Sequence, residues 1–240
     1  AGLYSDEHVV AWKKITDFVH KNSSAKIGVQ LGHAGRKAST RLQWEGGEKE
    51  QLPVIADNWP IISASPLAYT SNNQVPKEMD QADMDNVIKD YVKSVERAVE
   101  AGFDILELHC AHGYLLNSFL SPKTNIRTDK YGGSIGNRLR FPIQVFKAIR
   151  KAWPLEKPIS VRISAHDWIA GGFEPSDAVE VALAFKAAGC DIMDISSGQV
   201  VAEEEPVYGR LFQLPFSERV RFEANIPTIN PNIIGTIALS

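Results

Sequence analysis

Cysteine is scarce in this sequence, and long hydrophobic runs are absent. The 240 residues include two cysteines, Cys110 and Cys190, which is too few for a disulfide framework or a CxxC motif. Both stand in apolar, strand-like surroundings, so we expect reduced packing residues and therefore a cytoplasmic protein. No run is long and apolar enough to cross a bilayer, and no secretory signal peptide is recognisable.

The sequence also lacks an excess of charge of either sign. Its 26 basic and 29 acidic residues give a net charge of −3, which leaves no electrostatic footprint for nucleic acid or for an anionic membrane. A hydrophobic share of 44% and a charged share of 23% are typical of a soluble globular domain, and the length suits one α/β barrel. The chain opens at Ala1 without a methionine, and we expect it to be a fragment of a longer protein.

Helical and strand patterns alternate along the chain, which predicts parallel β/α units. The predicted strands are residues 26–31, 104–109, 159–164, 191–196 and 226–229. The predicted helices are residues 6–21, 82–101, a segment around 143–149, 176–188 and 215–224. We therefore predict the α/β class and a (β/α)8 TIM barrel, incomplete because the first two strands and the last are missing from the chain.

The predicted strands have one apolar and one polar face. In a doubly wound sheet both faces meet helices and are apolar, whereas polar residues on one face of successive strands fit the interior of a barrel that holds a polar ligand. The alternative is a sheet with one face in solvent. The polar face carries Gln30, Glu107, His109, Arg162, Asp194 and Ser196. We also expect Glu107 and Arg162, on neighbouring strands, to form an ion pair inside the barrel.

A long irregular stretch, residues 39–80, interrupts the alternation. It contains four prolines and the tryptophans Trp44 and Trp59. A loop of this length in a compact domain either covers a site or contacts a partner, or it is a tolerated surface insertion. We assign the whole chain, 1–240, to a single partial barrel domain that carries this loop.

Three titratable side chains follow the central predicted strand. His109, His112 and Tyr114 lie at its carboxyl end, where α/β enzymes place their catalytic groups. Taken singly, each is more often a packing or capping residue. The His-x-x-His spacing could be half a zinc site, but the helical ligand pair with a third ligand that zinc hydrolases use is not seen, so we expect no metal.

Four segments together resemble the Old Yellow Enzyme family of NADH:flavin oxidoreductases, in particular its bacterial-type branch with a His/His substrate pair. They are QLGHAGRK at 30–37, HCAHGYLLNSFLSPKTNIRTDKYGGS at 109–134, VRIS at 161–164 and DISSG at 194–198. Other segments look closer to the reductase-like carboxyl-terminal half of aminobenzoyl-CoA and salicylyl-CoA monooxygenases. These are NWP at 58–60, LHCAHGYLL at 108–116, ISAHDW at 163–168 and SSGQVV at 196–201, with the acidic run that follows.

The resemblance implies an FMN-bearing (β/α)8 barrel that takes hydride from NAD(P)H and reduces activated C=C bonds. Gln30 would bind the pyrimidine edge of the flavin, and Arg162 would lie beside N1 and the C2 carbonyl, where negative charge collects on reduction. His109 and His112 would bind the substrate carbonyl or nitro oxygen, and Tyr114 would protonate the α-carbon.

Three other functions remain open at this stage. The chain could be the reductase half of an aromatic acyl-CoA monooxygenase, with the long loop facing a CoA thioester or a partner domain. It could be a truncated, cofactor-free barrel that serves as an interaction protein. A zinc hydrolase built on His109, His112 and Glu107 is the weakest, because these residues lack the geometry of a helical ligand pair. We expect a small-molecule substrate, no nucleic acid or membrane partner, and either a homo-oligomer or a fused partner domain.

Overall fold

The computed structural model describes residues 2–40 and 59–230. Its main sheet has five parallel strands in the order β1-β4-β5-β6-β7. The strands are β1 (Gly28–Leu31), β4 (Ile105–Cys110), β5 (Ile159–Ser164), β6 (Ile192–Ser196) and β7 (Thr228–Ile229). All five coincide with the predicted strands, which confirms the α/β class and a sheet of the partial-barrel type.

Seven α-helices lie in the described part of the chain. They are α1 (Asp6–Asn22), α3 (Gln81–Glu100), α4 (Leu115–Leu120), α5 (Ile135–Arg138), α6 (Arg140–Ala152), α7 (Pro175–Ala187) and α8 (Leu214–Glu223). A short 3-10 helix, η1 (Gly35–Lys37), follows β1. The helices predicted from periodicity are confirmed with small shifts of their ends, whereas α5 and η1 are too short to have a periodic signature. None of the described helices combines the length and the apolar character needed to span a membrane.

The helix ends follow local chemistry. The Asp80 carboxylate accepts a hydrogen bond from the Asp83 backbone N–H at 2.9 Å and so caps the start of α3. Gly102, with φ +85°, stands just beyond the end of α3 in a left-handed conformation that suits glycine. Pro142 lies in the first turn of α6, where its missing N–H removes no intrahelical bond.

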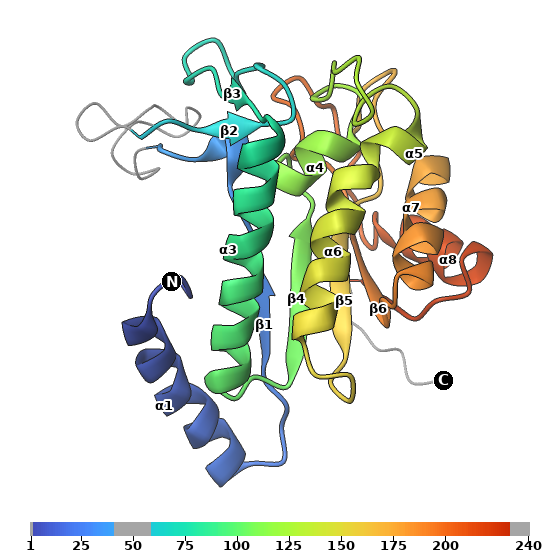
Figure 1. Ribbon diagram of the computed structural model, residues 1–240. Coiled ribbons are helices and arrows are strands. Elements are labelled where there is room, and N and C mark those ends of the chain that lie inside the picture. The colour runs from blue at the N-terminus through green and yellow to red at the C-terminus, as the bar shows by residue number, and fades with distance from the viewer. Residues whose placement is uncertain (1, 41–58, 231–240) are drawn as a thin grey trace.

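The sheet is apolar on one face and polar on the other. Helices α3, α6 and α7 stand side by side against the apolar face (Figure 1). That face is fully buried, and its side chains are Leu106, Leu108, Cys110, Val161, Ile163, Met193 and Ile195. At roughly 2 kcal/mol for each large buried aliphatic side chain, this layer is the main stabilising feature of the sheet.

The polar face is aligned by the ladder register. Gln30 is opposite Glu107, His109 is opposite Arg162, and Arg162 is opposite Asp194. Because directly opposed residues of parallel strands point to the same side, the polar residues predicted to share a face do share one.

The predicted ion pair between Glu107 and Arg162 is wrong. Glu107 is opposite Ser160 in the ladder and accepts hydrogen bonds from Gln30 Nε2 and Ser160 Oγ, both at 2.8 Å. Arg162 lies two residues further along its strand, and its Nε is 3.4 Å from Asp194 Oδ2. The positions of Glu107 and Arg162 within their own strands did not predict which residues they contact, because neighbouring strands of this sheet are offset along their length.

The long loop contains structure that the sequence did not indicate. Strands β2 (Ile62–Ser63) and β3 (Lys77–Glu78) form a separate two-stranded parallel sheet. This pair lies at the same end of the molecule as α4 (Figure 1). Trp59 is half exposed, whereas residues 41–58, including Trp44, lie outside the described part of the chain. The prediction that the loop covers a site or contacts a partner, and the alternative that it is a surface insertion, therefore both stay predictions for residues 41–58.

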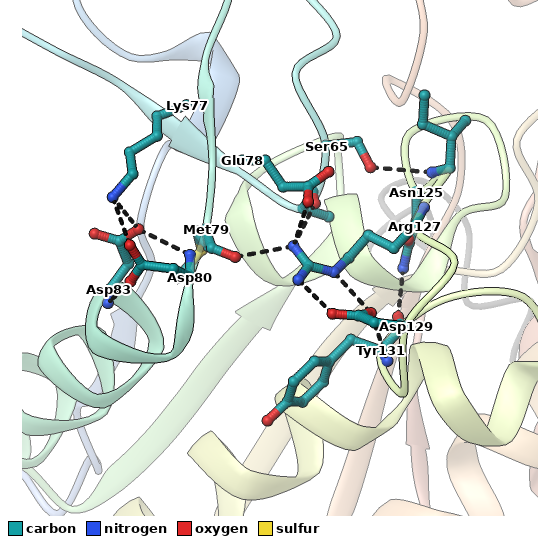
Figure 2. Close-up of polar contacts among 12 residues, drawn as sticks. Ser65, Lys77, Glu78, Met79, Asp80, Asp83, Asn125, Arg127, Asp129 and Tyr131 are labelled. Atoms are coloured by element: carbon teal, nitrogen blue, oxygen red, sulfur yellow. Dashed lines mark hydrogen bonds and ion pairs between the residues drawn. The ribbon is translucent and has the colours of Figure 1, made fainter.

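Arg127 holds this small sheet against the rest of the domain. Its Nη1 donates to the carbonyl oxygens of Ala64 at 3.0 Å and Met79 at 2.9 Å, and its guanidinium bonds both carboxylate oxygens of Asp129. Figure 2 shows the arginine between the Met79 carbonyl and Asp129. Asn125, two residues earlier, donates from its amide to the carbonyls of Phe119 and Tyr131. The Asn-x-Arg-x-Asp-x-Tyr motif is therefore a structural clamp.

We predict that Arg127→Met lowers the free energy of unfolding by about 2–3 kcal/mol, because two carbonyl oxygens lose a shared charged donor. Urea titration followed by circular dichroism measures the change. The matched control is Arg219→Met, which removes an exposed ion pair with Glu223 at 2.8 Å and should cost about 0.5 kcal/mol or less. Equal shifts in the two variants would contradict the clamp.

Candidate active site

The turn after β4 brings together the three titratable residues predicted from the sequence. His109 is the next-to-last residue of β4, His112 lies in the turn that follows, and Tyr114 is the N-cap of α4. The ring centroids of His109 and His112 are 5.0 Å apart, and those of His109 and Tyr114 are also 5.0 Å apart, both edge to face. The three side chains form one contiguous cluster at the carboxyl end of the central strand.

The turn has an unusual backbone that fixes the His112 side chain. His112 has φ +60° and Gly113 has φ +70°. A Cβ on Gly113 would lie 2.8 Å from the Gln199 carbonyl oxygen and 2.9 Å from that of Val200, so only glycine fits there. The His112 backbone N–H donates to Ser164 Oγ at 2.9 Å, which ties the turn to the end of β5.

The two imidazoles have different polar surroundings. His112 Nε2 is 2.7 Å from Ser196 Oγ, at the end of β6, and that oxygen also accepts from Gln213 Nε2 at 3.3 Å. His109 is 6% exposed, and its Nδ1 is buried with no hydrogen-bond partner among the described residues. A buried, unpartnered ring nitrogen is costly in a static scaffold and suits a group that binds a ligand.

Both imidazoles are held neutral. Burial lowers the pKa of His109 to about 4, assisted by the positive charges of Arg162 and Lys37. Burial lowers the pKa of His112 to about 3, with the same two cations and His109 adding to the effect. Each ring therefore has one N–H donor at neutral pH and no net charge.

A charged pair lies beside the histidines on the same sheet face. The Arg162 guanidinium is close to Asp194, as described above, and its Nε has no hydrogen-bond partner within the described ranges. Burial and the nearby Glu107 carboxylate raise the pKa of Asp194 to about 6, while Arg162 lowers it. Arg162 is thus a fixed cation whose hydrogen-bonding capacity is only partly used.

Gln30 lies on the same sheet face as His109, opposite the residue two positions before it. It projects from β1, donates to Glu107, and lines a hollow of about 640 Å³ between β1, α1 and α3. His112 and Arg162 line a second pocket, of about 220 Å³. The structure thus joins His109, His112 and Tyr114 in one cluster and places Arg162 beside it. Gln30 shares their sheet face and bonds Glu107 there.

The smaller pocket contains residues that sequence reasoning did not assign to the site. The β6–α8 connection supplies most of them, and the full set of such residues is Trp168, Ser196, Ser197, Gly198, Gln199, Glu204, Pro206, Tyr208, Phe212 and Gln213. The strand pattern places Ser196 on the polar face, and the carboxyl end of β6 was the signal that could have indicated Ser197. Gln213 precedes α8 in a connection without periodicity, and no sequence pattern marked it.

A metal centre finds no support in the described ranges. No group of three or more histidine, cysteine, aspartate or glutamate side chains gathers there as ligands. Glu107, the third residue of the zinc interpretation, is occupied by Gln30 and Ser160. Hydrogen-bond donors and one arginine dominate the cluster instead.

Comparison with known proteins identifies the family. The model of the NADH:flavin oxidoreductase / NADH oxidase family matches residues 1–235. An NADPH dehydrogenase of Geobacillus sp. (strain WCH70) is 43% identical over 227 residues, which are 95% of this chain and 61% of that protein. The NADPH dehydrogenase of Listeria welshimeri is 39% identical over 236 residues, covering 98% of this chain and 63% of its own length.

Solved structures give the same result at the level of the fold. Morphinone reductase has a TM-score of 0.74 at 25% identity, with 95% of this chain and 61% of that chain covered. A complex of 2-naphthoyl-CoA reductase with 2-naphthoyl-CoA has a TM-score of 0.79 at 25% identity and covers 95% of this chain and 35% of that one. The chain thus spans about 61% of the length of the first of these dehydrogenases. The resemblance seen in the sequence motifs is confirmed: the chain belongs to the NADH:flavin oxidoreductase / NADH oxidase family.

Proposed function

We propose that this protein is an FMN-dependent oxidoreductase that takes reducing equivalents from NAD(P)H and reduces activated C=C bonds. The observation that carries the proposal is the cluster of two neutral imidazoles and a phenol at the carboxyl end of β4, with a fixed guanidinium on the next strand. Membership of the flavin oxidoreductase family supports the same chemistry.

The donor set fits a flavin. The pyrimidine ring of FMN presents an N–H between two carbonyls, which a carboxamide and a guanidinium can match. Gln30 donates one N–H of its amide to Glu107, and its amide oxygen can accept such an N–H. Arg162 has a buried Nε without a hydrogen-bond partner among the described residues, and Gln213 has a buried Oε1 in the same condition. These side chains would hold the cofactor.

Bound FMN supplies a two-electron carrier that NAD(P)H reduces and that an alkene substrate oxidises. Arg162 would keep a positive charge beside the pyrimidine edge, which favours the reduced, more negative form. Asp194 limits this effect at neutral pH, because its carboxyl group, 3.4 Å from Arg162 Nε, is then ionised for the most part.

His109 and His112 would bind the oxygen of the substrate's carbonyl or nitro group. Their neutral rings donate N–H hydrogen bonds at a place where water is largely displaced by protein. As negative charge develops on that oxygen, each donor contributes about 3–4 kcal/mol to lowering the barrier. Tyr114, whose ring contacts His109 edge to face, would deliver the proton that the α-carbon needs, because a phenol O–H can donate a proton to a carbanion.

The alternatives have weaker support. A reductase of aromatic acyl-CoA thioesters is favoured by the segments that resemble acyl-CoA monooxygenases and by similarity to 2-naphthoyl-CoA reductase. The identity to that reductase is 25%, below the 43% to an NADPH dehydrogenase. If the protein bound no cofactor, the buried Arg162 Nε and His109 Nδ1 would stay without a hydrogen-bond partner among the described residues, and the interpretation as an interaction protein does not explain them. The proposed substrate is a small molecule with an activated alkene. The proposal also includes that the chain either forms a homo-oligomer or is fused to a partner domain.

We predict that His109 and His112 stay neutral in the folded protein down to about pH 4 and pH 3. The ordinary pKa of histidine is about 6.5, so between the lowered pKa and 6.5 the unfolded chain binds more protons than the folded one. In that pH range the two histidines therefore lower the free energy of unfolding of the protein as the pH falls. Asp194, with its raised pKa, acts in the opposite direction between about pH 4 and 6.

Imidazole NMR titration therefore tests each histidine directly, whereas overall stability does not. The variants His109→Gln and His112→Gln assign the signals. Midpoints close to 6.5 for both rings would show that the cluster is open to water and charged at mildly acidic pH, and would remove the basis for neutral donors.

We also predict that Tyr114→Phe slows the substrate-reduction half-reaction at least about 100-fold, the usual contribution of a positioned general acid. Flavin binding and reduction by NADPH should be unchanged, since the variant removes one hydroxyl. Stopped-flow absorbance with cyclohexenone as the oxidant separates the two half-reactions. Tyr131→Phe, which removes a hydroxyl that bonds Gln81 at 3.1 Å, is the matched control.

The first measurement is the visible spectrum of the protein after reconstitution with FMN. A flavin spectrum that persists through gel filtration supports the proposal. A protein that stays colourless overturns it in favour of a cofactor-free barrel. A full substrate-reduction rate in Tyr114→Phe leaves the flavin chemistry intact and rejects the tyrosine as the acid.

A further inference from the structure

We propose that Lys37 is a positioning residue of this site, whose ammonium group joins the two left-handed turns that carry His112 and Gln199. The inference concerns the same site as the proposed function and rests on it. It adds a residue on η1 that contacts neither histidine ring but determines where the His112 turn lies.

Lys37 reaches both turns with one nitrogen atom. Its Nζ donates a hydrogen bond to the His112 carbonyl oxygen at 2.9 Å and a second to the Gln199 carbonyl oxygen. The two acceptors belong to the β4–α4 and β6–α8 connections, and η1 follows β1. Three loops from separate strands therefore meet at a single cation.

The two carbonyl acceptors belong to residues with a strained backbone, which the hydrogen bonds from Lys37 can stabilise. His112 has φ +60° and Gln199 has φ +61°, in the left-handed region that residues other than glycine seldom occupy. The turns also pack tightly, since a Cβ on Gly113 would lie 3.2 Å from Lys37 Cε and closer still to the Gln199 carbonyl. A strained backbone persists only when its surroundings hold it, and the lysine supplies that hold.

The burial and the neighbours of the Lys37 ammonium group indicate that Lys37 does more than fill space in the core. Lys37 is 8% exposed, and its Nζ lies 4.2 Å from the centroid of the Tyr69 ring and 5.8 Å from that of Tyr114. A buried ammonium is costly unless it is bonded, whereas a methionine would fill the same space without that cost. The two carbonyl bonds and the Tyr69 ring are the interactions that a methionine could not replace.

The consequence for the site is geometric. The carbonyl that Lys37 holds belongs to the same residue whose ring meets Ser196 at 2.7 Å and whose N–H bonds Ser164. Fixing that carbonyl fixes the direction of the His112 side chain. The second carbonyl belongs to Gln199, which lines the pocket of about 220 Å³.

Amide hydrogen exchange on the whole protein tests the inference without flavin. In Lys37→Met the amides of His112 and Val200 should exchange at least about tenfold faster than in the wild type, because their turns open locally. The amide of Leu106 in the central strand, bonded to the Pro158 carbonyl, should keep its rate. Lys37→Arg should restore slow exchange, because a guanidinium also has several N–H donors. Lys151→Met, at an exposed position of α6, is the matched control.

Two results would overturn the inference. One is equal exchange at His112 and Val200 in Lys37→Met and Lys151→Met. The other is faster exchange at all amides including Leu106, which would make the lysine a determinant of global stability.

A double-mutant cycle tests the strain directly. Glycine adopts φ +61° without strain, so Gln199→Gly should reduce the effect of Lys37→Met on exchange at Val200. If Lys37→Met alone does not fold, Lys37→Met/Gln199→Gly decides: recovery of the fold supports the inference, and failure of both rejects it.

Kinetics of the FMN-loaded protein provide an independent readout. Lys37→Met should lower kcat of substrate reduction about tenfold or more with a smaller change in KM for NADPH, and Lys37→Arg should restore it, because only the donors to the substrate are displaced. A protein without ene-reductase activity would reject the proposed function, while the exchange result would still decide the role of Lys37.

Discussion

The register of the parallel ladder is the constraint on which the site depends. It sets His109 opposite Arg162 and Arg162 opposite Asp194, so that groups from three strands stand at one level of the sheet. Parallel pairing has no freedom to shift by one residue, because each shift would turn the buried aliphatic face toward the polar side. The hydrophobic layer under α3, α6 and α7 therefore determines the chemistry on the opposite face.

Burial then sets the charge state of what the register has assembled. Burial lowers the pKa values of the two imidazoles to about 4 and 3, so both are neutral at neutral pH. The same burial lowers the pKa of Lys37 to about 8, which still leaves most of its amine protonated at pH 7. Cations and neutral histidines can act side by side at neutral pH, since the former stabilise negative charge and the latter donate without carrying a charge of their own. The arrangement is that of a site prepared for an electron-rich ligand.

The sequence predicted the parts of the fold that repeat and failed where contacts are individual. Five strands, the long helices and the polar face follow from periodicity, which the buried layer imposes over many residues. The Glu107–Arg162 pair was wrong because the offset between β4 and β5 is a tertiary property. Strands β2 and β3, with two residues each, and the carbonyl contacts of Lys37 have no periodic signature. The clustering of His109, His112 and Tyr114 could be predicted because they lie close together in the chain.

The Arg127 clamp bears on how relatives of this protein are recognised. The Asn-x-Arg-x-Asp-x-Tyr signature holds a loop to the scaffold, and the hydrogen bonds of Arg127 involve no imidazole. A homologue could keep that signature, and with it the architecture, after exchanging both histidines for inert side chains. The side chains that hold this loop and the side chains proposed to act on a substrate are thus different residues of one stretch, 109–134, and the first set alone does not indicate activity.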